Sequence, residues 1–476
     1  MFIGIFVLFI IIYKDHVYTQ KADKILVESW FIMIYQEKKE INYPYLQKPV
    51  EIYTMPSGHT IVLVHKEGGL VNISTWVKTG SINENEEING ISHFLEHLMF
   101  KGTTKHKAGE FDKTLEAYGA IVNAATWKDY TFYYVTLPKG PNDKYFNEAI
   151  ELHADMMLDP ILPEDELGEP FVFGKEEPTQ KRERLVVIEE IRMRKDQPST
   201  RVYNALNKAM YTNHPYKRDV IGTPEIIAAV PQSVVMDYYK RFYTPNNMTT
   251  IVVGEFDSEK TLEKVAKEFD FKGRENCNLP IHEIDKPHSE TKYIELTGNL
   301  NTAFLMFGYL GPKANDLKNS VGLDIINIVL GDGSSSRLYQ RLIEQAEENI
   351  FNHVDTEFYQ FKDGGNFFVD ANFEPDKKDK AIELIKNEIQ QILDNGITEE
   401  ELAKAKKKLK VAYASTSETV SEIADNIGFY MTVLGNLEQA NEYLEIVENI
   451  SAEDVLQITR NYLTLNKATI AVMLPE

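Results

Sequence analysis

The chain has only one cysteine, Cys277, among its 476 residues. A single thiol excludes an internal disulfide and any cage of cysteine thiolates around a zinc ion. A metal bound by this chain must therefore be held by histidine and carboxylate side chains. The cysteine content leaves the cellular compartment undecided.

Basic residues are also scarce. The chain has 51 Lys and Arg against 73 Asp and Glu, which gives a formal net charge of −22. A surface of this charge repels a phosphate backbone, so no nucleic-acid partner is expected. Cationic substrates such as basic peptides fit this charge better.

Long hydrophobic runs are absent apart from the N-terminus. Met1 to Tyr13 reads MFIGIFVLFIIIY, which is shorter than the roughly 20 residues that cross a bilayer as a helix. It has neither a basic segment before it nor a small-residue cleavage site after it. A second apolar patch, Trp30 to Tyr35, is shorter still. Residues 1–49 are therefore expected to form an N-terminal extension. It is either a targeting or anchoring element of an exported or membrane-associated protein, or, in a cytoplasmic protein, an apolar extension or the result of a start codon assigned too early.

The remaining sequence is typical of a globular protein, with 43% hydrophobic and 26% charged residues. Its length predicts two to four domains. From Val50 onward, short alternating strands such as Thr60 to His65 and Ile121 to Thr126 are interspersed with helical segments such as Lys144 to Leu158. This pattern indicates an α+β fold.

The chain also contains an internal repeat. Arg241 to Val253 resembles Arg460 to Val472, 219 residues later. A polar segment broken by two prolines, residues 272–291, separates the two halves and indicates a linker. We therefore predict two homologous domains, residues 50–271 and 292–476.

One stretch of the first half carries the clearest chemistry. Ile91 to Phe100 reads ISHFLEHLMF and places His93, Glu96 and His97 within about one helical turn. Residues four apart lie one above the other on a helix, so both imidazoles can reach one cation. A hydrolytic zinc site needs three protein ligands and a carboxylate that takes a proton from water. Without further support, a structural histidine pair remains the alternative.

The missing ligand is expected on the acidic helical segment Glu183 to Glu190. These two glutamates are seven residues apart, so they project from one face and can act as an outer and an inner carboxylate. The alternative is a solvated acidic helix. The apolar run Leu185 to Ile188 favours a packed helix instead.

Gly90 to Thr103, GISHFLEHLMFKGT, resembles the signature of the pitrilysin and mitochondrial processing peptidase family of zinc metallopeptidases, whose H-x-x-E-H motif reverses the commoner zincin order. Similarity continues through Asn123 to Thr126, Glu183 to Pro198 and Thr244 to Gly254, and covers about Tyr53 to Glu476.

The resemblance implies one Zn2+ per chain, with His93, His97 and Glu190 as ligands, Glu96 as general base and Glu183 as a supporting carboxylate. It also implies two α/β-sandwich domains, each a mixed, mostly antiparallel sheet covered by helices. The two would form a clamshell around a closed chamber.

The resemblance further implies how a peptide substrate is held. The strand Ile121 to Thr126 would pair with the substrate backbone, with Asn123 and Ala124 as contact points.

The chain departs from this family in two places. His97 and Glu190 are 93 residues apart, more than is typical, because of an acidic insertion at residues 168–180 that we expect near the cleft mouth. Second, an Arg and a Tyr that bind the substrate carbonyl in the family are replaced by Ile343 and Ile350.

The missing Arg and Tyr predict a dimer. In one hypothesis this chain is the catalytic subunit of a two-subunit peptidase, and a paralogous subunit supplies Arg and Tyr. In the other, Arg341 or Phe351 takes the role within a homodimer; the nearest later tyrosine is Tyr359.

The sequence thus predicts a zinc-dependent endopeptidase that cleaves unfolded peptides or presequences. The alternative is a non-catalytic structural subunit of a processing-peptidase-like assembly, but such a scaffold needs no metal ligands.

Overall fold

A computed structural model of the chain describes residues 34–175, 177–180 and 182–476. The apolar segment Met1 to Tyr13 lies outside the described residues, so both interpretations of it remain open. Among the helices of the described part, none combines the length and hydropathy needed to cross a membrane.

The first half is built on a sheet of seven strands in the order β1-β2-β3-β7-β4-β6-β5. These strands are β1 (Glu37–Ile41), β2 (Val50–Thr54), β3 (Thr60–His65), β4 (Leu70–Val77), β5 (Ile121–Thr126), β6 (Thr131–Pro138) and β7 (Met248–Gly254). Only the β3–β7 pair is parallel. Strand β5 lies at one edge and has β6 as its single neighbour.

This sheet begins earlier than residue 50, where the sequence placed the start of the domain. Strand β1 pairs antiparallel with β2, from Glu37 opposite Thr54 to Ile41 opposite Val50. Its sequence, EKKEI, has one apolar residue, and four of its five side chains are exposed. An edge strand of this kind carries no hydrophobic alternation, so the pattern gave no sign of it.

Helices cover the first sheet. They are α2 (Ile91–Met99), α3 (Glu110–Ala117), α4 (Lys144–Leu158), α5 (Glu164–Leu167), α6 (Glu183–Lys195), α7 (Pro198–Met210), α8 (Pro224–Ala229), α9 (Gln232–Phe242) and α10 (Ser258–Glu268). The apolar faces of α2, α4, α6 and α9 share one large buried cluster with the sheet. Residues 269–291 contain neither helix nor strand.

The second half repeats this arrangement. Its strands are β8 (Lys292–Gly298), β9 (Ala303–Gly311), β10 (Phe351–Phe361), β11 (Gly364–Phe373) and β12 (Thr469–Pro475). Its helices are α11 (Leu317–Leu330), α12 (Arg337–Tyr339), α13 (Lys378–Asn395), α14 (Glu399–Ser415), α15 (Val420–Phe429), α16 (Gln439–Asn449) and α17 (Ala452–Tyr462).

The strand orders of the two sheets match. The order β8-β12-β9-β11-β10 reproduces β3-β7-β4-β6-β5, including one parallel pair at the same place. Strands β7 and β12, which carry the repeated sequence, hold equivalent positions. The predicted α+β fold with two homologous, helix-covered sheets is therefore confirmed.

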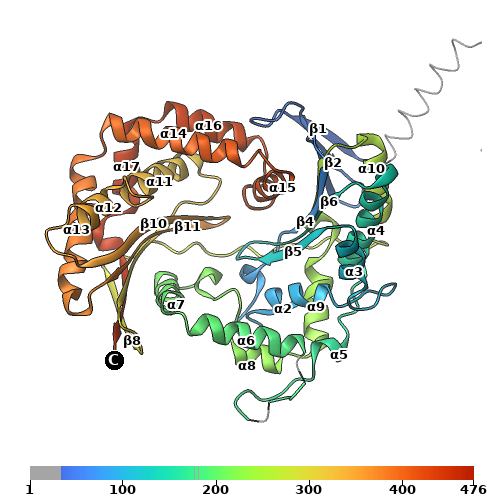
Figure 1. Cartoon of the computed structure of the whole chain (residues 1–476), viewed down its shortest axis with the longest axis horizontal. Coiled ribbons are helices and arrows are strands. Elements are labelled where there is room, and N and C mark those ends of the chain that lie inside the picture. Colours follow the sequence, from blue (N-terminus) through green and yellow to red (C-terminus); the bar gives the residue numbers. More distant parts are fainter. Residues whose placement is uncertain (1–33, 176, 181) are drawn as a thin grey trace, which may run out of the picture.

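Each half places one helix on the sheet of the other half. Helix α15 packs on β4 and β7 of the first sheet, and α7 packs on β9 and β12 of the second. Two further apolar clusters join the halves at these helices. Figure 1 shows the halves side by side, with α15 against the first sheet and α7 beneath the second. Helices α7 and α15 thus lie between the two sheets.

Candidate metal centre and active site

Helix α2 carries the H-x-x-E-H motif on its less buried side. Six of its nine residues are buried: Ile91, Ser92, Phe94, Leu95, Leu98 and Met99. Packing of this apolar face against the first core fixes the rotation of the helix. His93, Glu96 and His97 therefore project from the opposite side, and each stays partly accessible to solvent.

The N-terminus of α2 is held by Glu84, which sequence reasoning missed. One oxygen of its carboxylate accepts the N–H of Gly90 at 2.8 Å, and the other accepts the N–H and the hydroxyl of Ser92 at 2.8 and 2.6 Å. Burial raises the pKa of Glu84, although these hydrogen bonds oppose the rise. A carboxylate here satisfies donors that the helix leaves free and complements its dipole. The only sequence signal is an acidic residue shortly before the helix.

Gly90 precedes α2 in a conformation that requires glycine. Its φ is +98°, and a Cβ at this position would lie 2.5 Å from the carbonyl oxygen of Ile221. This close approach brings the start of α2 against the loop that leads to α8.

The structure brings His93, His97 and Glu190 together. The Nε2 atoms of His93 and His97 lie 3.7 and 3.6 Å from the same oxygen, Oε2, of Glu190. Ligand atoms about 2.0–2.1 Å from a tetrahedral zinc ion are roughly 3.3 Å apart. Among the described residues, this is the one group of three or more metal-binding side chains whose donor atoms lie within 4.8 Å of one another.

The donor set also fits zinc in its chemistry. Two imidazole nitrogens and one carboxylate oxygen are a common set for a zinc site that leaves a position open. The side chains of His97 and Glu190 are 24% and 28% exposed, so the site is open to solvent in this chain.

Glu183 lies behind the ligands, as predicted for the outer carboxylate. Its Oε2 is 3.3 Å from Nδ1 of His97, and its Oε1 is 2.8 Å from Nζ of Lys101. An acceptor at Nδ1 favours the tautomer that leaves Nε2 free to bind a metal. Lys101, one turn beyond His97, was not predicted to take part.

The two histidines have opposite pKa shifts in the metal-free chain. Burial and the neighbouring His97 lower the pKa of His93 to about 4. Burial also disfavours the charged form of His97, but the neighbouring carboxylates of Glu183 and Glu190 raise its pKa to about 9. The pKa of Glu190 is lowered, chiefly by the neighbouring His97, so this carboxylate stays ionised.

Glu96 is tied to strand β5. The hydroxyl of Thr126, the last residue of β5, donates to Oε2 of Glu96 at 2.6 Å. Burial raises the pKa of Glu96, and the bond from Thr126 only partly opposes this rise. The sequence placed Thr126 at the end of the strand but gave no sign of its contact with Glu96.

The edge strand β5 presents alternate side chains to solvent. Ile121, Asn123 and Ala125 are exposed, whereas the residues between them face the helices. The side-chain oxygen of Asn123 accepts the N–H of Ala124 at 2.9 Å. Both predicted substrate contacts therefore lie on the sheet edge nearest the metal ligands.

The second half offers no substitute for the missing Arg and Tyr at the predicted positions. Ile343 packs against the second core and Ile350 is 1% exposed within it. Phe351 is also buried in that core, so its side chain cannot reach a substrate. Arg341 pairs with Glu388 at 2.6 Å.

The insertion at residues 168–180 packs beside α6 and α8. The N–H of Phe171 donates to the carbonyl of Ala228 at 2.9 Å, and the buried Arg184 donates to the carbonyl of Gly168 at 3.0 Å. In Figure 1 this loop projects beyond α6 and α8, on the side away from β5.

Comparisons with known proteins identify the family of the chain. The chain matches the family models "Insulinase (Peptidase family M16)" over residues 60–224 and "Peptidase M16 inactive domain" over residues 230–409. The uncharacterized zinc protease YmxG of Bacillus subtilis is 29% identical over 418 residues, which cover 87% of this chain and 96% of YmxG. Zinc protease PqqE of Helicobacter pylori is 28% identical over 433 residues, covering 89% of this chain and 93% of PqqE.

A solved structure, a protease from Helicobacter pylori, has a TM-score of 0.81 at 26% identity and covers 90% of this chain and 100% of its own. The duplicated fold, the H-x-x-E-H helix and these matches lead to one conclusion: the chain belongs to the pitrilysin family of peptidases, family M16, in its two-domain bacterial form.

Proposed function

We propose that this chain is a zinc-dependent endopeptidase whose first half cleaves extended, unfolded peptides. The observation that carries the proposal is the position of Glu96. Its carboxylate lies beside the ligand set and is hydrogen-bonded to the end of an exposed edge strand. A general base, a metal site and a peptide-binding edge therefore meet at one place.

The residues of the site divide the chemistry between them. A zinc ion held by His93, His97 and Glu190 would supply a Lewis acid that polarises a carbonyl and a water molecule. Glu96 takes the proton of the attacking water and passes it to the leaving amine. Because burial raises its pKa, Glu96 is a stronger base than an exposed glutamate.

Strand β5 captures the substrate. It has a neighbour on one side only, so backbone groups on its other side are free to pair with an extended peptide. Asn123 and Ala124 are the proposed contact points. Pairing through the backbone makes few demands on substrate sequence, which suits a peptidase for unfolded peptides or presequences.

We further propose that the active form is a dimer. The ligand side chains are open to solvent in this chain, and the two positions expected to bind the substrate carbonyl are held by isoleucines of the second core. A paralogous subunit that supplies Arg and Tyr would complete and enclose the site. A homodimer that uses Phe351 or Arg341 is the weaker hypothesis, because Phe351 is buried and Arg341 is paired with Glu388.

The first experiment is metal analysis of the natively purified chain, which we expect to contain about one zinc ion. Glu96→Gln should keep zinc and lose peptidase activity by about 100-fold or more. Glu190→Gln should lose much of both. Glu189→Gln is the matched control, because Glu189 is exposed on the same helix and pairs with Arg192. Absence of zinc in the native chain would contradict the proposal.

The partner needs a separate test. If the purified chain alone cleaves an extended peptide as fast as any mixture with a related chain that carries Arg and Tyr, the obligate heterodimer is wrong.

The second candidate function is a non-catalytic structural subunit. The description "inactive domain" belongs to the model that matches residues 230–409, and the metal ligands lie outside that range. A scaffold would need neither the ligand set nor a base beside it. Bound zinc without peptidase activity, in any mixture, would favour this candidate.

A further inference from the structure

We infer that Asp129 and Tyr216 are positioning residues, through which the metal-free second half holds strand β5 in place against Glu96. This inference rests on the proposed function and assigns a task to the half that carries no metal ligands.

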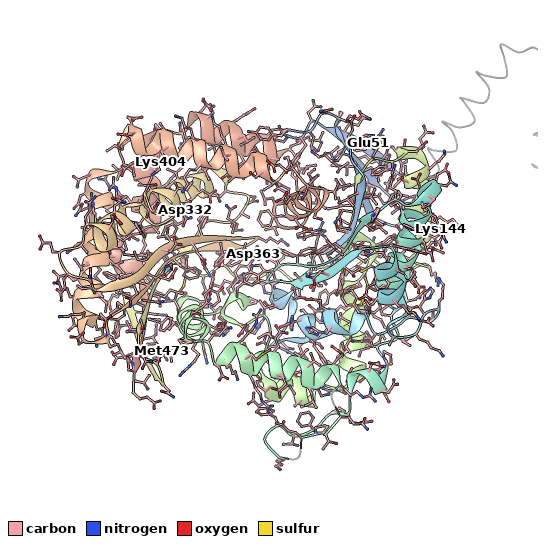
Figure 2. The ribbon with its side chains drawn as sticks, viewed as in Figure 1. Glu51, Lys144, Asp332, Asp363, Lys404 and Met473 are labelled. Atoms are coloured by element: carbon pink, nitrogen blue, oxygen red, sulfur yellow. The ribbon has the colours of Figure 1, made fainter. Side chains whose placement is uncertain are left out.

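The contact is made by the β10–β11 hairpin of the second half. At its tip, the N–H of Lys362 donates to Oδ2 of Asp129 at 2.9 Å, and the N–H of Asp363 donates to the hydroxyl oxygen of Tyr216 at 3.1 Å. That hydroxyl in turn donates to Oδ1 of Asp129 at 2.6 Å. Figure 2 shows Asp363 in the middle of the molecule, between the halves. Two successive N–H groups of one half thus bind a carboxylate and a phenol of the other.

These groups are buried in the junction. Asp129 is 5% exposed and Tyr216 is 1% exposed. Burial raises the pKa of Asp129, while the hydrogen bonds from Tyr216 and Lys362 oppose the rise. Loss of either bond to Asp129 would leave one of its buried oxygens without a partner, so these bonds keep the tip and the carboxylate in one relative position.

Asp129 belongs to the turn that follows the substrate strand. The turn spans residues 127–130 and is closed by the N–H of Trp127, which donates to the carbonyl of Tyr130 at 2.8 Å. Thr126, immediately before it, donates to Glu96. Because β5 has only one neighbouring strand, its position depends on how its ends are held. The hairpin of the second half holds the end beside the general base.

The 3-10 turn η3 (Pro215–Lys217) carries Tyr216 and supports the same turn from the first half. The ammonium group of Lys128 donates to the carbonyl of Tyr216 at 2.7 Å. Tyr216 is therefore linked to the 127–130 turn through its backbone carbonyl, and its hydroxyl bonds both to Asp129 of that turn and to the hairpin of the second half. Removing only the hydroxyl should loosen the joint between Asp129 and the hairpin and leave the backbone contact with Lys128 in place.

The experiment compares two Tyr→Phe substitutions in the full-length, zinc-loaded chain. Tyr216→Phe removes the hydroxyl that joins Asp129 to the hairpin. Tyr211→Phe is the matched control, because the hydroxyl of Tyr211 also crosses between the halves, to Asn366 at 2.5 Å, but does not bond to the 127–130 turn. Both should lower the melting temperature by similar amounts and keep zinc.

Of the two Tyr→Phe substitutions, Tyr216→Phe alone should lower kcat, by about tenfold, with a smaller change in KM. The reason is that β5 can still pair with a peptide but no longer aligns it with Glu96. Asp129→Asn should behave in the same way. Thr126→Val should also lower kcat, and combining it with Tyr216→Phe should cost less than the product of the two separate losses. Equal kcat losses in Tyr216→Phe and Tyr211→Phe, or full additivity with Thr126→Val, would overturn the inference.

Amide hydrogen exchange tests the contact independently of peptidase activity. In Tyr216→Phe, but not in Tyr211→Phe, exchange should accelerate in residues 121–130. If the wild-type chain cleaves no peptide, either alone or mixed with a related chain that carries Arg and Tyr, the proposed function fails, while hydrogen exchange still shows whether Tyr216 positions residues 121–130. Unchanged exchange in residues 121–130 would overturn the inference whatever the activity.

Discussion

His93 and His97 are the same residue type on one helix, yet their surroundings differ at the scale of single atoms. Both imidazoles face the carboxylate of Glu190, but His97 also has the carboxylate of Glu183 at its Nδ1, and its pKa rises to about 9 although burial opposes the rise. At His93, burial and the neighbouring imidazole outweigh the attraction of Glu190, and its pKa falls to about 4. At neutral pH the metal-free site therefore holds one protonated and one neutral imidazole.

This difference predicts that zinc binding at pH 7 releases about one proton, because His97 carries a proton well below its pKa and must lose it to bind a metal. The share of this release that comes from His97 should fall toward zero as the pH rises through about 9. His93 should contribute none, since its pKa lies far below 7. Calorimetry in buffers of different ionisation enthalpy measures this number.

Glu183→Gln provides the check. Loss of the carboxylate beside Nδ1 should lower the pKa of His97 and so decrease the number of protons released at pH 7. An unchanged number would show that Glu183 does not set the protonation of His97.

At the scale of the element, α2 depends on a cap that is not part of it. Glu84 binds the N–H groups of Gly90 and Ser92 and the hydroxyl of Ser92, which also lies 2.8 Å from the hydroxyl of Tyr238 on α9. The cap therefore fixes the start of the helix relative to the first core. By fixing the start of α2, the cap also fixes where the metal-binding side chains of this helix lie.

We predict that Glu84→Gln lowers the free energy of unfolding of the metal-free chain by about 1–3 kcal/mol, because an amide nitrogen would replace one of the two acceptor oxygens and the charge at the helix N-terminus would be lost. Zinc affinity should fall as well. Urea unfolding and zinc titration measure the two effects. Glu86→Gln is the control, because the side chain of Glu86 is 71% exposed and its loss should change stability by less than about 0.5 kcal/mol. Equal effects of both substitutions would refute the cap.

At the scale of the whole molecule, the exchange of α7 and α15 makes each half depend on the other. Without α15, the residues of β4 and β7 that face it, Trp76 among them, would lose their apolar cover. Apolar area of this kind contributes about 25 cal/mol per Å² when buried. The two halves should therefore unfold as one cooperative unit.

A substitution at the α15 contact tests this expectation. A Cβ on Gly428 would lie 2.0 Å from the Trp76 ring, so Gly428→Ala should destabilise the chain by about 1–3 kcal/mol. The single thermal transition should shift as a whole. Gly69→Ala is the control, because nothing lies within 4 Å of its Cβ position and its stability should change little. A second transition in Gly428→Ala, with one half still folded at the wild-type temperature, would contradict the mutual dependence.

Features that depend on neighbouring residues in the chain could be predicted from local patterns alone. The spacing of His93, Glu96 and His97 predicts their shared helical face, because 3.6 residues per turn is a local property. The alternation of β5 and the repeat ending in β7 and β12 predicted the strands and the two copies. Glu183 and Glu190 could be proposed as outer and inner carboxylates for the same reason.

Which of these elements contact one another is visible only in the folded chain. It brought Glu190 to the histidines across 93 residues, placed Thr126 against Glu96, set Glu84 at the start of α2 and exchanged α7 and α15 between the sheets. Such contacts depend on packing between elements that are distant in the chain. The pattern of a segment shows which of its sides is apolar, but not which other element will cover that side.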